Sequence, residues 1–145
     1  MDYRFQECLK KGNLVKIPLD QALAAKELSG GEYDLKRAKN SLSEGDSKWC
    51  IVQSYYSMFH TVKALIYSKG YREKSHKCLL IAFKALYVGE SLLEERFYLT
   101  FEEAMNLREE ADYGLTYSTE AAEEAVKNAG ELLEKARELM ESKSD

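Results

Sequence analysis

The side chains best suited to chemistry gather in one central stretch of this 145-residue chain, residues 47–89. The stretch contains both histidines, His60 and His76, and the only tryptophan. An imidazole can exchange a proton near neutral pH and can also hydrogen-bond to an anion. The central stretch is therefore the first place to look for a catalytic or ligand-binding site.

His76 stands in a strongly basic segment. Arg72 and Lys74 precede it, Lys77 follows it, and Ser75 is a suitable N-cap for a helix that begins at His76. Free amides and the positive end of the helix dipole favour an anion at such a start. Arg72, Lys74 and His76 thus form a candidate phosphate site. The alternative is a solvated basic loop in which His76 only caps the helix.

His60 follows Tyr56 by one helical turn and precedes Lys63 by about one turn. These positions border the apolar stripe of a predicted helix rather than facing bulk water. One interpretation is a histidine at the edge of the core with a satisfied hydrogen bond. The other is a polar group in a cleft.

Arg108 and Asp112 are four residues apart on another predicted helix. Residues at this spacing share one helix face, so an intrahelical salt bridge is the simplest interpretation. The functional alternative is that Asp112 orients Arg108 into a groove. His60, His76 and Arg108 are therefore the candidate catalytic residues, and the candidate ligand-binding residues are Arg72, Lys74, His76, Arg108 and Asp112.

The sequence contains no phosphate-binding glycine loop, nucleophile elbow or metal-ligand cluster, so neither a cofactor nor a metal is predicted. Cys8, Cys50 and Cys78 are widely spaced, and we expect free thiols that act as small hydrophobic residues. No apolar run reaches the roughly 20 residues of a membrane span. Together with the absence of a signal-peptide pattern, this predicts a cytoplasmic protein with no membrane partner.

Charge is distributed unevenly along the chain. Residues 48–89 carry seven basic residues and one acidic residue, net +6, whereas residues 90–145 carry six basic and sixteen acidic residues, net −10. The two blocks either neutralise each other, within the fold or across a dimer, or leave the basic block facing an anionic ligand.

The periodicity of apolar residues predicts one all-α domain over residues 1–145, an antiparallel up-and-down bundle of four to five helices with its core at about 19–140. Tyr56 and Phe59 are predicted to be core residues and not ligand contacts. Whether Ser29–Gly31 is a true break or a kink stays open. A short first helix would turn Tyr3, Phe5, Cys8 and Leu9 inward. The predicted helices span about residues 2–11, 19–42, 48–69, 76–88, 92–113 and 118–140, with a basic loop at 71–74 and a turn at 114–117.

Three phrases of the sequence, taken together, resemble the HEPN family, the higher eukaryote and prokaryote nucleotide-binding domains. They are Ser54-Tyr55-Tyr56-Ser57-Met58-Phe59-His60, Lys69-Gly70-Tyr71-Arg72-Glu73-Lys74-Ser75-His76, and Leu107-Arg108 followed by Ala111-Asp112-Tyr113. The resemblance covers about residues 20–140 and is greatest to the small stand-alone HEPN proteins of bacteria and archaea. It implies a helical bundle that is usually dimeric and paired with a minimal nucleotidyltransferase, often in a toxin–antitoxin system.

The resemblance also implies a metal-independent ribonuclease motif, an arginine followed after four to six residues by histidine. Arg108 matches the arginine, but Tyr113 to Leu115 hold no histidine, and only three residues separate Arg72 from His76. The leading hypothesis is therefore a nucleotide- or RNA-binding HEPN module, non-enzymatic or weakly active, that dimerises and partners a nucleotidyltransferase. The alternatives are an endoribonuclease with a non-standard active site and a structural interaction protein.

Overall fold

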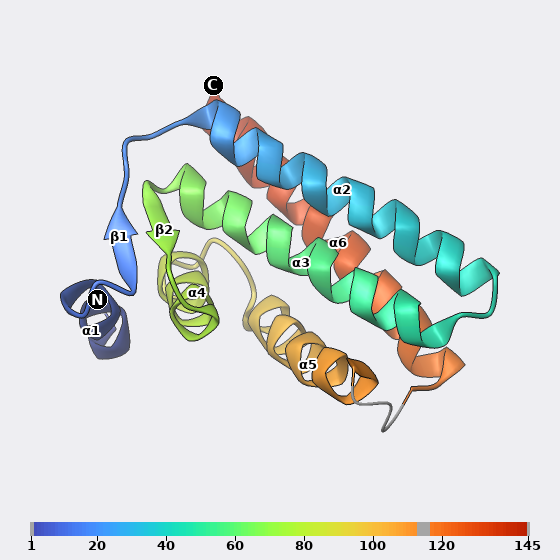
Figure 1. Cartoon of the computed structure of the whole chain (residues 1–145). Helices are drawn as coiled ribbons and strands as arrows, with labels where there is room; N and C mark the ends of the chain where they lie inside the picture. The colour runs from blue at the N-terminus through green and yellow to red at the C-terminus, as the bar shows by residue number, and fades with distance from the viewer. Residues whose placement is uncertain (1, 113–116, 145) are drawn as a thin grey trace.

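The computed structural model describes residues 2–112 and 117–144, except the side chains at 109–112 and 142–144. Its long helices form the predicted all-α bundle, and the predicted turn at 114–117 lies mostly outside the described residues (Figure 1). The elements are α1 (Tyr3–Lys10), β1 (Leu14–Lys16), α2 (Gln21–Ser43), α3 (Ser47–Ser68), β2 (Tyr71–Glu73), α4 (His76–Phe83), the π-helical turn η1 (Lys84–Val88), α5 (Glu95–Asp112) and α6 (Thr119–Ser144).

α3 is the central helix of the bundle. It runs between α2 and α5, with α6 behind it and α4 near its C-terminal end (Figure 1). Asp46 caps its start, because the Asp46 carboxylate accepts a hydrogen bond from the backbone N–H of Trp49 at 3.2 Å. Burial on most sides explains why its predicted apolar stripe is so wide. The stripe residues Val52, Tyr55, Val62 and Ile66 are all buried.

α2 continues through Gly30 and Gly31 without a break, which answers the question left open by the sequence. A Cβ atom on Gly31 would lie 2.7 Å from Thr61 Oγ1 and 3.0 Å from the backbone oxygen of Ser57. The Ser57 hydroxyl donates a 2.7 Å hydrogen bond to the Gly31 carbonyl. The glycines therefore allow α2 and α3 to approach closely.

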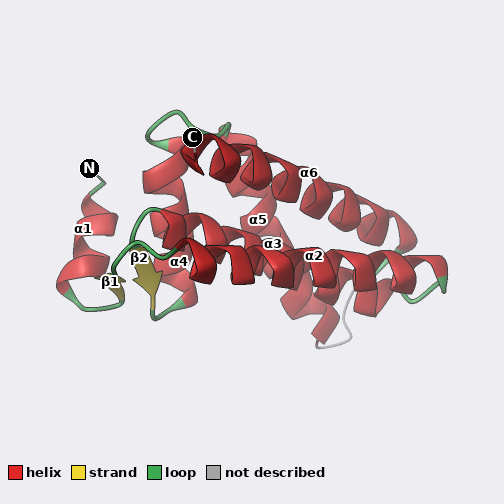
Figure 2. Cartoon of the chain, turned by 90° about the horizontal axis from the view of Figure 1, so that it is seen from above, coloured by secondary structure: helices red, strands yellow, loops and turns green. Residues whose placement is uncertain are grey.

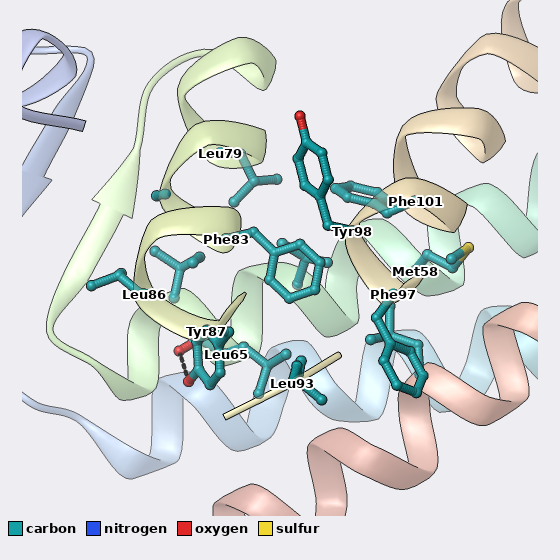
Figure 3. Packing of buried hydrophobic residues seen from close by; sticks show 14 of the residues in the cluster. Met58, Leu65, Leu79, Phe83, Leu86, Tyr87, Leu93, Phe97, Tyr98 and Phe101 are labelled. Carbon is teal, nitrogen blue, oxygen red and sulfur yellow. Dashed lines mark hydrogen bonds between the residues drawn. The ribbon is translucent and has the colours of Figure 1, made fainter. Parts of the chain in front are cut away.

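The aromatic core lies where α4 and α5 pack on α3. Phe83, Phe97 and Phe101 are almost fully buried there, together with Tyr87 (Figure 3). The Tyr87 hydroxyl donates a 2.6 Å hydrogen bond to the backbone oxygen of Leu65, and burial raises the pKa of Tyr87 to about 12. The buried Tyr87 hydroxyl thus has a hydrogen-bond partner. Burying a hydroxyl without one would cost free energy.

Two of the expected core residues are only partly buried. Tyr56 and Phe59 pack against the core cluster, but each keeps part of its ring accessible. The prediction that they are core residues is therefore only partly correct, because on their outer side they meet Arg108 of α5 and His76 of α4 rather than apolar side chains. Both rings therefore contribute to the partly exposed face of α3 described below.

The secondary structure of residues 2–17 and 71–74 differs from the prediction. The predicted basic loop contains β2, which pairs antiparallel with β1 so that Val15 lies opposite Arg72. Figure 2 shows α1, β1 and β2 together at one end of the molecule. Phe5 and Cys8 of α1 are buried as predicted, whereas Tyr3 is 75% exposed. The two strands are far apart in sequence and each is only three residues long, so no local periodicity predicts that they pair.

Two helix boundaries also move. The predicted helix over 76–88 is α4 followed by the π-helical turn η1, and the helix expected from Leu92 begins at Glu95. The predicted N-cap Ser75 is confirmed, since its hydroxyl accepts a hydrogen bond from the backbone N–H of Cys78. Ser118 caps α6 in the same way by accepting from the backbone N–H of Ala121. No helix in the described part of the chain is both long and apolar enough to cross a membrane.

The expectation of three free thiols is wrong. Cys8 of α1 and Cys78 of α4 form a disulfide, although 70 residues separate them in sequence. Cys50 is free and buried, and its thiol lies 3.6 Å from the backbone oxygen of Ala122. Only the packing of α1 on α4 brings Cys8 and Cys78 together.

Candidate functional site

α3 carries one narrow row of side chains that its neighbours cover only in part. Residues three and four positions apart lie on one helix face, and along this face they are only partly buried. The rest of the central part of α3 is buried. We call this set the α3 row, and it consists of Gln53, Tyr56, Phe59, His60 and Lys63.

His60 is held between two carboxylates of α2. Its Nδ1 lies 2.7 Å from Glu27 Oε2, and its Nε2 lies 3.6 Å from Asp34 Oδ2. Gly30 leaves room for the ring, since a Cβ there would come within 3.4 Å of it. The His60 side chain remains 32% exposed. His60 therefore has a satisfied hydrogen bond, as the simpler interpretation expected, and is also accessible to solvent.

The same two acids lie in a partly desolvated setting. Burial raises the pKa of Asp34, and the nearby His60 partly opposes the rise. Glu27 also contacts Lys63, whose Nζ lies 3.6 Å from Glu27 Oε1. Burial alone would lower the pKa of Lys63, but Glu27 and Glu73 outweigh it, and the pKa lies above its usual value. The middle of the α3 row is thus a charge-balanced cluster.

Phe59 brings the two histidines to one place. Its ring centroid lies 5.7 Å from that of His60 and 5.1 Å from that of His76, which reaches it from the start of α4. Lys63 Nζ lies 5.2 Å from the same ring. The structure therefore assembles around one phenyl group two histidines that are sixteen positions apart in sequence.

Arg108 reaches the α3 row from α5. It donates a 3.0 Å hydrogen bond to the Tyr56 hydroxyl, and its guanidinium carbon lies 5.7 Å from the rings of both Tyr55 and Tyr56. Tyr56 lies one helical turn before His60, so Arg108 and His60 are positioned by the same face of α3. Asp112 belongs to α5, but its side chain lies outside the described part, so the proposed Arg108–Asp112 pair has no structural account.

The remaining candidate residues form what we call the basic corner, which consists of Arg72, Lys74 and His76. Arg72 projects from β2, with its guanidinium carbon 5.7 Å from the ring of Tyr67 on α3. Lys74 and His76 are exposed. At the start of α4, the Ser75 hydroxyl already accepts a hydrogen bond from the backbone N–H of Cys78 at 3.1 Å. The corner adjoins the α3 row through Tyr67 and Phe59.

Glu27 and Asp34 are the site residues that sequence reasoning missed. They lie seven positions apart on α2 with Gly30 between them, so they share one helix face with a glycine gap. That pattern was available in the sequence. The sequence does not show how α3 lies against α2, and the side chain that fills the gap at Gly30 is His60 of α3.

The chain belongs to the HEPN family. A family model described as the HEPN domain matches residues 25–139, which include the α3 row, the basic corner and Arg108. The family suggested by the three phrases of the sequence is therefore confirmed.

Two proteins of the archaeon Methanocaldococcus jannaschii are similar to this chain. One, named "Putative toxin MJ0605", is 30% identical over 95 residues, which cover 66% of this chain and 71% of the relative. The other, named "Putative toxin MJ0142", is 28% identical over 121 residues, which cover 82% of each chain.

Proposed function

We propose that this chain is a toxin-like HEPN module that binds RNA or a nucleotide through the α3 row and the basic corner. One observation carries the proposal. Arg108 from α5, His76 from α4 and Arg72 from β2 each contact an aromatic ring of α3. Nucleotides favour exposed aromatic rings beside cations, since bases stack on rings and phosphates pair with cations. Tyr56 and Phe59 are the partly exposed rings here, whereas Tyr67 is buried and only packs against Arg72.

The ligand's phosphates should lie at the two ends of this surface. Glu27 and Asp34 in the middle compensate His60 and Lys63 and would repel a phosphate placed on them. Arg108 at one end and the basic corner at the other offer cations, and an arginine fork can donate two hydrogen bonds to one phosphate. A nucleotide would use one end, whereas a short RNA would span both.

Fluorescence anisotropy with labelled RNA at two salt concentrations tests the proposal. Binding that depends on charge weakens as salt rises. The variant Arg72→Ala/Lys74→Ala should lower affinity about tenfold or more, because it removes two phosphate contacts. The matched control is Lys36→Ala/Lys39→Ala, which removes the same charge from exposed positions of α2. Salt-insensitive binding, or equal losses in both variants, would contradict a specific site.

The proposal includes a homodimer and a minimal nucleotidyltransferase partner in the cytoplasm, where the RNA ligand occurs. The toxin names of the two relatives support a toxin–antitoxin pairing, and the large exposed side chains Trp49, Tyr33 and Leu99 offer apolar surface for association. Light scattering at micromolar concentration should give the mass of a dimer, and a monomer mass would contradict this part. A nucleotidyltransferase gene beside this one would support the pairing.

A second candidate function, metal-independent RNA cleavage, is favoured by the two histidines on Phe59. It differs from the binding mode above, because the scissile phosphate would have to lie over Phe59 between the two imidazoles, against the negative charge of Glu27 and Asp34. One imidazole would accept the proton of a 2′-hydroxyl whose oxygen attacks phosphorus. The bond from phosphorus to the 5′-oxygen would then break, and the second imidazole would protonate that oxygen. Glu27 would orient His60 for either role.

Incubation with RNA in excess chelator tests this second function. The expected products carry 2′,3′-cyclic phosphate ends, and His60→Asn and His76→Asn should each abolish them. If RNA stays intact while anisotropy shows binding, the chain is a binding module and not a nuclease.

A further inference from the structure

We propose that the Cys8–Cys78 disulfide is a redox-reversible clasp that holds α1 and β1 against the basic corner, so that its reduction weakens RNA binding. The part that concerns RNA rests on the proposed function. The part that concerns the clasp stands on the geometry of the N-terminal residues. We call residues 3–17, which include α1 and β1, the N-terminal unit.

The N-terminal unit lies before the part of the chain that matches the family, which begins at residue 25. It is also at the edge of the bundle, since α1 stands apart from α2, α5 and α6 in both views (Figures 1 and 2). It docks chiefly by α1 packing on α4 and by β1 pairing with β2. Loss of the unit's contacts should therefore leave the four long helices packed.

The unit contacts each segment that carries the basic corner. Val15 pairs with Arg72, and the backbone N–H of Lys74 donates a 2.8 Å hydrogen bond to the Asn13 carbonyl. Phe5 packs edge-on against Tyr71 with ring centroids 5.4 Å apart. Cys78 itself lies in the first turn of α4, two positions after His76. The unit thus fixes the backbone from which the three cations of the corner project.

Apart from the disulfide, the unit is held by a small apolar contact, the short sheet and two flanking backbone hydrogen bonds, Lys74 to Asn13 and Ile17 to Gly70. Phe5 and Leu14 are its large buried side chains, and β1 contributes three residues to the sheet. A short two-stranded pairing is marginal in water by itself. The disulfide joins the unit to α4 covalently and limits how far β1 can separate from β2. Without it, opening of the unit should become much more frequent.

Reduction requires an external thiol. A reductant thiolate attacks one sulfur, the S–S bond breaks and the released cysteine thiolate takes up a proton. A second reductant thiol then displaces the first from the mixed disulfide. The protein gains two electrons and two protons, leaving Cys8 and Cys78 as thiols, and the reductant becomes its own disulfide. Because both cysteines are only 5% exposed, the attack must await a partial opening of the unit.

Hydrogen exchange read by mass spectrometry tests the clasp directly, on the oxidised protein and on protein treated with dithiothreitol. Reduction should accelerate exchange about tenfold or more in residues 3–17 and 71–78, and leave the amides of α2, α3 and α6 unchanged. Cys8→Ser should behave like reduced protein with or without dithiothreitol. Cys50→Ser is the matched control, since Cys50 is free and lies elsewhere in the core, and it should respond to dithiothreitol as the wild type does.

Anisotropy with labelled RNA then tests the link to binding. Affinity should fall several-fold on reduction and in Cys8→Ser, and Cys50→Ser should again follow the wild type. Unchanged exchange after reduction, or alkylation of both Cys8 and Cys78 in unreduced protein, overturns the clasp. Faster exchange with unchanged RNA affinity overturns its control of binding. If oxidised protein binds no RNA at all, the proposed function fails, and the exchange result still decides the clasp.

Discussion

The two histidines approach the same phenyl ring from surroundings of opposite character. His60 and its neighbour Lys63 face Glu27 and Asp34, carboxylates whose side chains are 18% and 22% exposed. On the other side, the described part of the chain offers no carboxylate within ion-pair distance of Arg72 or Lys74. We call the first region the seam, meaning Glu27, Asp34, His60 and Lys63, and compare it with the basic corner.

The comparison shows that one basic block of sequence serves two purposes. Both regions draw cations from residues 48–89, whose net charge is +6. In the seam, acids from α2 neutralise those cations at a helix contact, where partners offset the cost of desolvation. In the corner, the three side chains are exposed to water, and under the proposed function their charge is available to a ligand. Changes in the seam should therefore affect stability, and changes in the corner should affect binding.

The largest expected effect is at the ring that joins the two regions. Phe59→Ala should lower the free energy of unfolding by about 2–3 kcal/mol, because the ring is only partly buried. Phe101→Ala, at a fully buried ring, should cost about 3–5 kcal/mol. Urea titration of both variants measures the difference. An equal loss would mean that Phe59 is as enclosed as the core and cannot adjoin a ligand.

The glycine contact of α2 with α3 comes next. Gly31→Ala should destabilise by about 1–3 kcal/mol, since the new methyl group would overlap Thr61 and the Ser57 carbonyl. The control is Gly130→Ala in α6, where the nearest atom to a new Cβ, on Leu35, lies 4.0 Å away. This change should be neutral or stabilise by up to about 1 kcal/mol through helix propensity. Thermal unfolding that ranks the two variants in the opposite order would contradict the close packing of α2 on α3 at Gly31.

A change of charge in the seam should have a smaller effect. Glu27→Gln keeps the shape but weakens the interactions with His60 and Lys63, and should cost about 1–2 kcal/mol at neutral pH. Arg72→Ala/Lys74→Ala, in the corner, should change stability by less than about 0.5 kcal/mol. Chemical denaturation of both proteins tests the contrast. A corner variant less stable than Glu27→Gln would reverse the assignment of the two regions.

The smallest effect concerns pH. Burial raises the pKa of Asp34 above its unfolded value, so the folded state binds the proton more tightly. Stability attributable to Asp34 should therefore fall as pH rises from about 3.8 through the raised pKa. Asp34→Asn removes this fall, with a difference below about 1 kcal/mol. Melting curves of both proteins across this range measure it, and a wild-type advantage that grows with pH would show that His60 dominates instead.

Much of the site was predictable because its signals are local. Three of its features depend on residues within a few positions of one another: the apolar stripe of α3, the cap at Ser75, and the grouping of Arg72, Lys74 and His76. Helical period and capping chemistry act over that range. The same reasoning placed Tyr56 and Phe59 in the core, although both are only partly buried, because periodicity identifies an apolar face but not which neighbours cover it.

By itself, the sequence determined the all-α class, the main helices and the family, since these depend on short-range patterns distributed along the chain. Only the tertiary structure decided that His60 meets Glu27 and Asp34, that Phe59 joins His60 to His76, and that Cys8 bonds to Cys78. Each of these contacts links helices whose relative position is set by packing, here by the Gly30–Gly31 gap and by the docking of α1 on α4. Packing depends on all of the surfaces at once, and for that reason no local pattern records it.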